Sequence, residues 1–143
     1  MFKVVVASAK SLAEMIQVGN YDHVNSDITS EHFPVQGKEK VKCEIELICY
    51  GRCMQSDDVV RDLESRGMRP ATLFELLAFG AQYPEQQREF PVVALGSVWQ
   101  DRYGDRWVAY LDGDESDEFG RYLCLGRWVE GWLCEDLFAA IRK

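Results

Sequence analysis

One cysteine and two histidines are the residues of this sequence whose types suit nucleophilic catalysis. Cys53 follows a predicted strand, and His23 and His32 lie in an early polar segment close to Asp22 and Glu31. A cysteine nucleophile needs a nearby base, usually histidine, and an acid that orients this base. Cys53 with His23 or His32 is therefore a candidate catalytic site, although their spacing does not require them to meet. Carboxylates gathered in a pocket are the other way to build a small enzyme.

Five carboxylates fall within the seven residues Asp112–Glu118. The alternating oxygen side chains from Asp112 to Ser116 match the first ligands of a calcium-binding hand. The sixth position, which needs glycine, is Asp117, and the twelfth, which needs a bidentate carboxylate, is Leu123. A solvated acidic hairpin loop is therefore the better interpretation of this segment.

The cysteines offer a second route to a metal site, because Cys49 and Cys53 have three residues between them and Cys124 with Cys134 would complete four zinc ligands. Cys43 and Cys49, however, alternate with polar residues on the apolar face of a predicted strand, where free cysteine acts as a small hydrophobe. We predict no metal and no cofactor. Five cysteines at irregular spacing, without a signal peptide, indicate reduced thiols and a cytoplasmic location.

The charge of the chain is strongly negative, at −8 with a pI near 4.8. Between Asp101 and Asp136 there are ten acidic residues, four arginines and no lysine. This balance argues against direct nucleic-acid binding, which depends on Lys and Arg, and against anionic membranes. It favours a protein partner with a basic surface.

Aromatic residues crowd the same stretch and alternate with its arginines. Core packing explains them, but tryptophans exposed together would form a protein-binding patch, because Trp, Tyr and Arg dominate interface anchors. The binding residues that we expect are Asp112, Asp114, Glu115, Asp117, Glu118, Trp107 and Trp128.

The elements that must position these residues begin with a predicted buried strand over Phe2–Ala7, rich in β-branched valine. A capping box at Ser11 predicts a helix that ends at Gly19. Asn20–Lys40 is polar and irregular, which is typical of a loop. Val41–Tyr50 alternates apolar and charged residues and is the clearest strand.

Two helices follow that strand. The first is predicted over Ser56–Arg66, capped by Ser56 and ended by Gly67. A capping box at Thr72 begins the second, which is apolar nearly all round, should be the central buried helix and ends at Tyr83.

The rest of the chain predicts a meander of strands separated by turn signals. The apolar runs are Val92–Trp99, Arg106–Leu111, Arg121–Leu125 and Trp132–Ile141. The last run also fits a helical stripe, and a strand at its start is favoured narrowly.

The stretches Gly67–Gly80 (GMRPATLFELLAFG) and Pro91–Ser97 (PVVALGS) resemble a group of small uncharacterised bacterial proteins. The resemblance covers the middle and last thirds of the chain. It implies a natural single domain and no particular activity.

Together these patterns predict one α+β domain over residues 1–143. An antiparallel sheet of C-terminal hairpins, joined by strand 41–50, should pack against two or three helices, with Phe2–Ala7 at an edge or beside strand 41–50. We expect a non-catalytic interaction or regulatory protein, inhibitor-like in form, that binds a basic protein surface. A small enzyme with a cysteine or carboxylate site is the alternative, and self-association into a homo-oligomer stays open.

Overall fold

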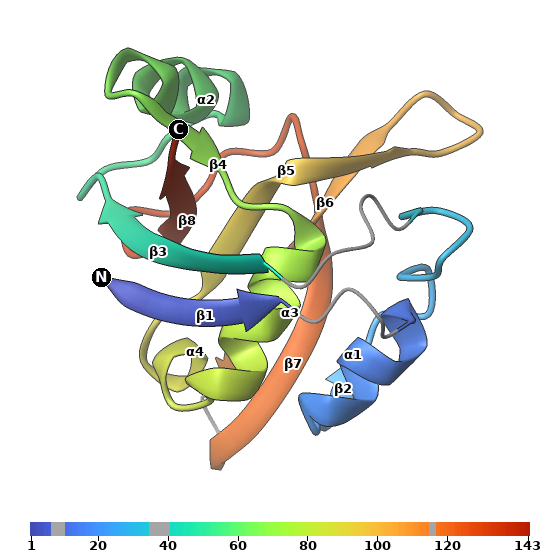
Figure 1. Ribbon diagram of the computed structural model, residues 1–143. Coiled ribbons are helices and arrows are strands. Elements are labelled where there is room, and N and C mark those ends of the chain that lie inside the picture. The colour runs from blue at the N-terminus through green and yellow to red at the C-terminus, as the bar shows by residue number, and fades with distance from the viewer. Residues whose placement is uncertain (7–10, 35–40, 115–116) are drawn as a thin grey trace.

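A mostly antiparallel sheet organises the chain (Figure 1). The computed structural model describes residues 1–6, 11–34, 41–114 and 117–143. Its strands are β1 (Phe2–Val6), β2 (His23–Val24), β3 (Val41–Cys49), β4 (Met68–Pro70), β5 (Val92–Gln100), β6 (Arg106–Asp114), β7 (Asp117–Arg127) and β8 (Leu137–Arg142). Their order is β1-β3-β8-β5-β6-β7-β2, and β4 pairs with β8 beside this path. The β5·β8 and β2·β7 pairs are parallel and the others antiparallel.

The helices are α1 (Leu12–Val18), α2 (Ser56–Ser65), α3 (Leu73–Gln82) and the short α4 (Gln86–Glu89). With these elements the predicted α+β class is confirmed. Strand 41–50 does join the C-terminal strands, through β8, and β1 is both an edge strand and the neighbour of β3. No helix among the described residues is long and apolar enough to cross a bilayer.

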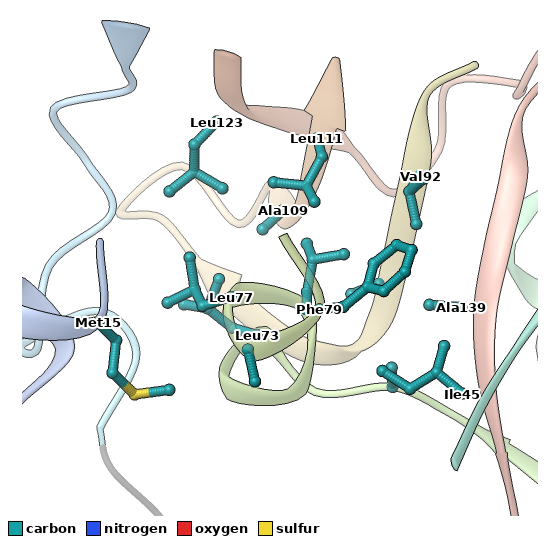
Figure 2. Close-up of a cluster of buried hydrophobic side chains, with 14 of the residues drawn as sticks. Met15, Ile45, Leu73, Leu77, Phe79, Val92, Ala109, Leu111, Leu123 and Ala139 are labelled. Atoms are coloured by element: carbon teal, nitrogen blue, oxygen red, sulfur yellow. The ribbon is translucent and has the colours of Figure 1, made fainter. Parts of the chain in front are cut away.

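Two hydrophobic clusters cover the two faces of the sheet. In β5, Val92 and Ala94 belong to one cluster, and Val93 and Leu95 belong to the other, as the period of two in a strand requires. The first cluster lies beneath α3 and α1, and Figure 2 shows α3 side chains meeting those of the sheet. The second cluster lies beneath α2 and the segment 128–132. The middle of the sheet is thus buried on both sides.

The central helix α3 forms where the sequence predicts it. Thr72 Oγ1 accepts from the Glu75 N–H, and the Glu75 carboxylate accepts from the Thr72 N–H, which completes the capping box. At its other end, Gln82 donates to the Val5 carbonyl and accepts from the Val5 N–H. The side chain of Gln82 therefore satisfies the backbone of edge strand β1 where a further strand would pair.

A buried arginine in β7 is hydrogen-bonded to residues in or next to the helices. Arg121, in β7, is 5% exposed. Its guanidinium donates to the carbonyls of Gly19, just after α1, and Gly80, in α3, and to the Gln87 side chain. Burial lowers its pKa, and its planar charge lies 4.7 Å from the centre of the Tyr21 ring. These contacts supply hydrogen bonds to both terminal nitrogens of the buried guanidinium, while its Nε is buried without a partner among the described residues.

Several predicted helix ends need correction. Gln55, and not Ser56, is the N-cap of α2, and the Ser56 hydroxyl instead makes hydrogen bonds with segment 128–132. The first helix does end at Gly19, but Gly19 has ordinary helical geometry, and Asn20 takes the left-handed conformation expected at Gly19, with φ of 52°. Gly67, which the sequence predicts to end α2, adopts positive φ just after this helix.

The last apolar run also differs from the prediction. Trp132 makes an isolated bridge with Met54, a turn follows, and the strand occupies Leu137–Arg142 at the end of the run. The helical alternative is wrong, because β8 gains ladder partners in β3, β4 and β5 that no local pattern reveals. The short elements β2, β4 and α4 were not predicted either.

Candidate functional site

The acidic loop can be placed only in part. Glu115 lies outside the described residues, and the side chains of Asp114, Asp117 and Glu118 are not described. Asp112 is described, is half-buried and lines a cavity on one face of the sheet. Of the five predicted acids, Asp112 alone can therefore be assigned a place.

The two tryptophans expected at a binding surface are buried or half-buried, and their indole N–H groups donate to residues of the same chain. Trp128 is 8% exposed and donates through Nε1 to Asp57. Trp107 is half-buried and donates through Nε1 to Asp101. Because their rings and polar atoms have internal partners, the expected patch of exposed tryptophans is not formed. The expected exposure is therefore wrong, and a role of Trp107 and Trp128 in binding stays a prediction.

The structure does not bring Cys53 together with either histidine. The His32 ring stacks on Trp99 with the ring centres 3.9 Å apart. His23 lies in β2, at the opposite end of the sheet order from β1 and β3, whereas Cys53 lies between β3 and α2 (Figure 1). Among the described residues no three metal-ligating side chains gather either. The strongest chemical site therefore lies elsewhere.

That site is a cavity of about 190 Å³ on the sheet face that also carries α2. Its floor is formed by β6 and β7. Tyr110 and Asp112 alternate onto the same face of β6, and Gly126 of β7 leaves the space beside them. Pro91 and the segment 130–136 provide the walls.

Trp132 is the most firmly held part of these walls. Its backbone exchanges two hydrogen bonds with Met54, and its Nε1 donates to Ser56 Oγ at 2.8 Å. Ser56 in turn donates to the Trp128 carbonyl. The absence of a side chain at Gly126 admits the indole, because a Cβ there would lie 2.7 Å from Trp132 Cη2. The wall is thus fixed to α2 and fitted to the floor.

The electrostatics of the cavity centre on Asp136, which is 7% exposed. Its Oδ2 accepts from the Leu133 N–H at 2.9 Å. Burial raises the pKa of Asp136, the hydrogen bond from Leu133 opposes this, and the negative charges of Glu135 and Asp112 raise the pKa further. A carboxylate in this setting would gain from a cation beside it.

The other charges leave the cavity net negative. Asp112, Glu130 and Asp136 line it, and Arg127 is its cationic lining residue. Arg127 already pairs with Asp105 at 2.8 Å, and more loosely with Glu130 at 3.9 Å. Tyr110 brings a ring whose pKa is raised to about 12, chiefly by burial, so it is a neutral phenol at physiological pH. Chemically, the cavity suits a positively charged group.

One exposed apolar side chain lines this cavity, and two others adjoin its lining residues in the chain. Leu133, a lining residue, is 58% exposed. Phe90 and Val129, both exposed, each adjoin a lining residue in the chain. An exposed apolar residue in the wall of a polar cavity can contact a bound partner.

Sequence reasoning missed Tyr110, Gly126, Trp132 and Asp136 as site residues. In the sequence Asp136 is one of many acidic residues, and nothing nearby marks it as buried, because β6 and β7, which form the cavity floor, lie earlier in the chain. No protein-family model matches the chain, and neither a curated protein nor a solved structure matches it.

Proposed function

We propose that this protein is a non-catalytic interaction domain that binds a basic protein surface and takes a lysine or arginine side chain into the acid-lined cavity. The observation that carries the proposal is the buried Asp136 carboxylate, which shares the cavity with Asp112. A buried negative charge without a cation is costly, and a basic group from a partner would compensate it.

The walls suit the rest of such a side chain. Tyr110 and Trp132 face the cavity with their ring centres 5.9 Å apart in an edge-to-face arrangement. Aromatic rings attract ammonium and guanidinium groups through cation–π interactions, and they cover the apolar stem of the side chain. The net charge of −8 would also speed the approach of a basic partner.

A protein partner fits better than a small free cation. The exposed Phe90, Val129 and Leu133 would gain from being covered, and a free amine cannot cover them. An arrangement with a charged anchor at the centre and apolar contacts around it is common in protein interfaces.

A glycine-flanked arginine peptide, compared with the same peptide carrying neutral citrulline, tests the proposal by NMR titration. We expect the arginine peptide to bind with a Kd of about millimolar order and to shift the indole N–H signal of Trp132. Asp136→Asn should weaken binding about tenfold, which corresponds to about 1.4 kcal/mol. Asp58→Asn, which removes the same charge from an exposed position on α2, is the matched control. Equal affinities of the two variants would show that net charge alone attracts the peptide and would overturn the proposal.

The carboxylates favour one further candidate, a small enzyme. An acid with a raised pKa beside a second carboxylate is the arrangement that general acid–base catalysis uses. A panel of chromogenic ester and glycoside substrates tests this candidate. Turnover that Asp136→Asn abolishes, while peptide binding is absent, would favour the enzyme over the interaction domain.

A further inference from the structure

We propose that Cys49 and Cys134 are a redox pair that closes reversibly into a disulfide. Cys49 is the last residue of β3, and Cys134 lies in the turn that leads into β8. The Cys49 thiol already points at this turn, because its Sγ donates to the Cys134 carbonyl oxygen at 3.7 Å. No other pair of cysteines among the described residues is joined by such a contact.

The sheet register keeps the two residues together. Cys49 pairs with Leu137 across the β3·β8 ladder, and Leu137 follows Cys134 by three residues. The intervening turn is closed by the hydrogen bond from the Asp136 N–H to the Leu133 carbonyl at 3.1 Å. The chain therefore folds back so that Cys134 lies beside the end of β3.

The hydrogen bond brings the Cys49 sulfur close to Cys134. A carbonyl oxygen lies about 2.4 Å from its own Cα, so the Cys49 sulfur lies within about 6 Å of the Cys134 Cα. Disulfide-bonded residues have Cα atoms about 4.4–6.8 Å apart. Bond formation therefore requires rotation of the two exposed side chains, and movement of the turn that carries Cys134 where the two Cα atoms are farther apart than this.

Exposure separates this pair from two other cysteines. Cys49 and Cys134 are exposed, whereas Cys43 and Cys124 are half-buried, and burial raises the pKa of both these thiols. The thiolate is the reactive form, so an exposed thiol reacts more readily than a buried one with a raised pKa. Cys53 is also exposed, which makes it a matched control.

The reaction is thiol–disulfide exchange with a low-molecular-weight disulfide as the oxidant. The thiolate of one cysteine attacks a sulfur of the oxidant, forms a mixed disulfide and releases one thiolate of the reagent. The second cysteine, after losing its proton, attacks the protein sulfur of this mixed disulfide and displaces the second reagent thiolate. The two protein thiols lose two electrons and two protons, and the reagent disulfide is reduced to two thiols.

The bond would act on the wall of the acid-lined cavity. Cys134 lies between Leu133 and Asp136, which both line the cavity, and the disulfide would fasten their turn to β3. The redox pair itself does not depend on the ligand of the cavity, so its test needs no partner.

Incubation of the full chain with oxidised glutathione, followed by peptide mapping under non-reducing conditions, tests the pair. We expect a Cys49–Cys134 linked peptide in the wild type and in Cys53→Ser, and its loss on reduction. Cys49→Ser and Cys134→Ser should each trap a stable glutathione adduct on the remaining cysteine. The oxidised wild type should unfold at a higher urea concentration than the reduced protein, because the cross-link restricts the unfolded chain. Adducts on both cysteines of the wild type without a linked peptide, or a linkage that contains Cys53, would overturn the proposal.

Discussion

Replacing Gly126 with alanine tests how closely the cavity wall is fitted to the sheet. The added Cβ would lie 2.7 Å from Trp132 Cη2, 3.2 Å from its Cζ3 and 3.3 Å from Tyr110 Cε1. Carbon atoms in contact are normally about 3.5–4.0 Å apart, so the indole must move by about 1 Å. Trp132 is held by its two backbone bonds to Met54 and by the bond from Nε1 to Ser56, which resist that movement.

The cost follows from these contacts. Overpacking a well-packed site costs about 1–3 kcal/mol, and loss of the Trp132–Ser56 hydrogen bond would add about 1 kcal/mol. We therefore expect Gly126→Ala to lower the free energy of unfolding by about 2–4 kcal/mol, which is a large part of the total for a domain of this size. The displaced indole should also narrow the cavity and weaken binding of the arginine peptide.

Urea unfolding measures the effect, and Gly131→Ala is the matched control. Gly131 lines the same cavity, but a Cβ there would meet just the flexible end of Gln55, at 3.2 Å. We expect this control to change stability by less than about 0.5 kcal/mol. Equal unfolding midpoints for the two variants, or an unmoved Trp132 indole N–H signal in Gly126→Ala, would refute the reasoning.

Three further substitutions test other parts of the structure. Arg121→Met should lower the free energy of unfolding, measured in urea, by about 3 kcal/mol, because it leaves three buried acceptors unpaired, although it also removes one buried charge. The control Arg61→Met, at an exposed position, should lower it by less than about 0.5 kcal/mol. The folded-state pKa of Asp136 is raised above the ordinary carboxyl value of 3.8, so the wild type is most stable below pH 3.8 and loses stability as the pH rises through the folded-state pKa. Asp136→Asn has no such group, so its stability relative to the wild type should increase over this pH range. A constant difference in unfolding midpoint across that range would contradict this. Gln82→Ala should cost about 1 kcal/mol and increase self-association in light scattering, because it uncovers the edge of β1, and a variant that stays monomeric would show that the edge is protected otherwise.

The elements that could be predicted are those whose signal lies within a short stretch of the sequence. The alternation of Val41–Cys49 marks β3, and the Thr72 capping box marks α3, because each signal lies within one element. The two residues of β2 and the three of β4 are strands only because β7 and β8 lie beside them. Ser56 likewise resembles a helix N-cap in the sequence, but its hydroxyl is hydrogen-bonded to Trp128 and Trp132, which lie far away in the chain.

The candidate site was less predictable for the same reason. Charge counting found the acidic C-terminal third and included Asp112, but it could not separate a buried carboxylate from a solvated one. The burial of Asp136 requires a turn after Trp132, whereas the sequence there narrowly favoured a strand, with a helix as the alternative. Core packing was one explanation of the aromatic residues, but the sequence could not assign Trp107 and Trp128 to it, because the partners of their indole nitrogens, Asp101 and Asp57, lie outside their own elements.

If the cavity does take up a cation, binding must be linked to the proton of Asp136. Burial raises the pKa of this carboxyl group, and a cation in the cavity would lower it, since it favours the charged form. Binding of the arginine peptide should therefore release protons at a pH near or below the folded-state pKa, and its affinity should fall as the pH falls. Calorimetry in two buffers with different ionisation enthalpies counts the released protons. Asp136→Asn should release fewer, and a wild type that binds the peptide with the same proton release as this variant would show that the cation is held by carboxylates outside the cavity.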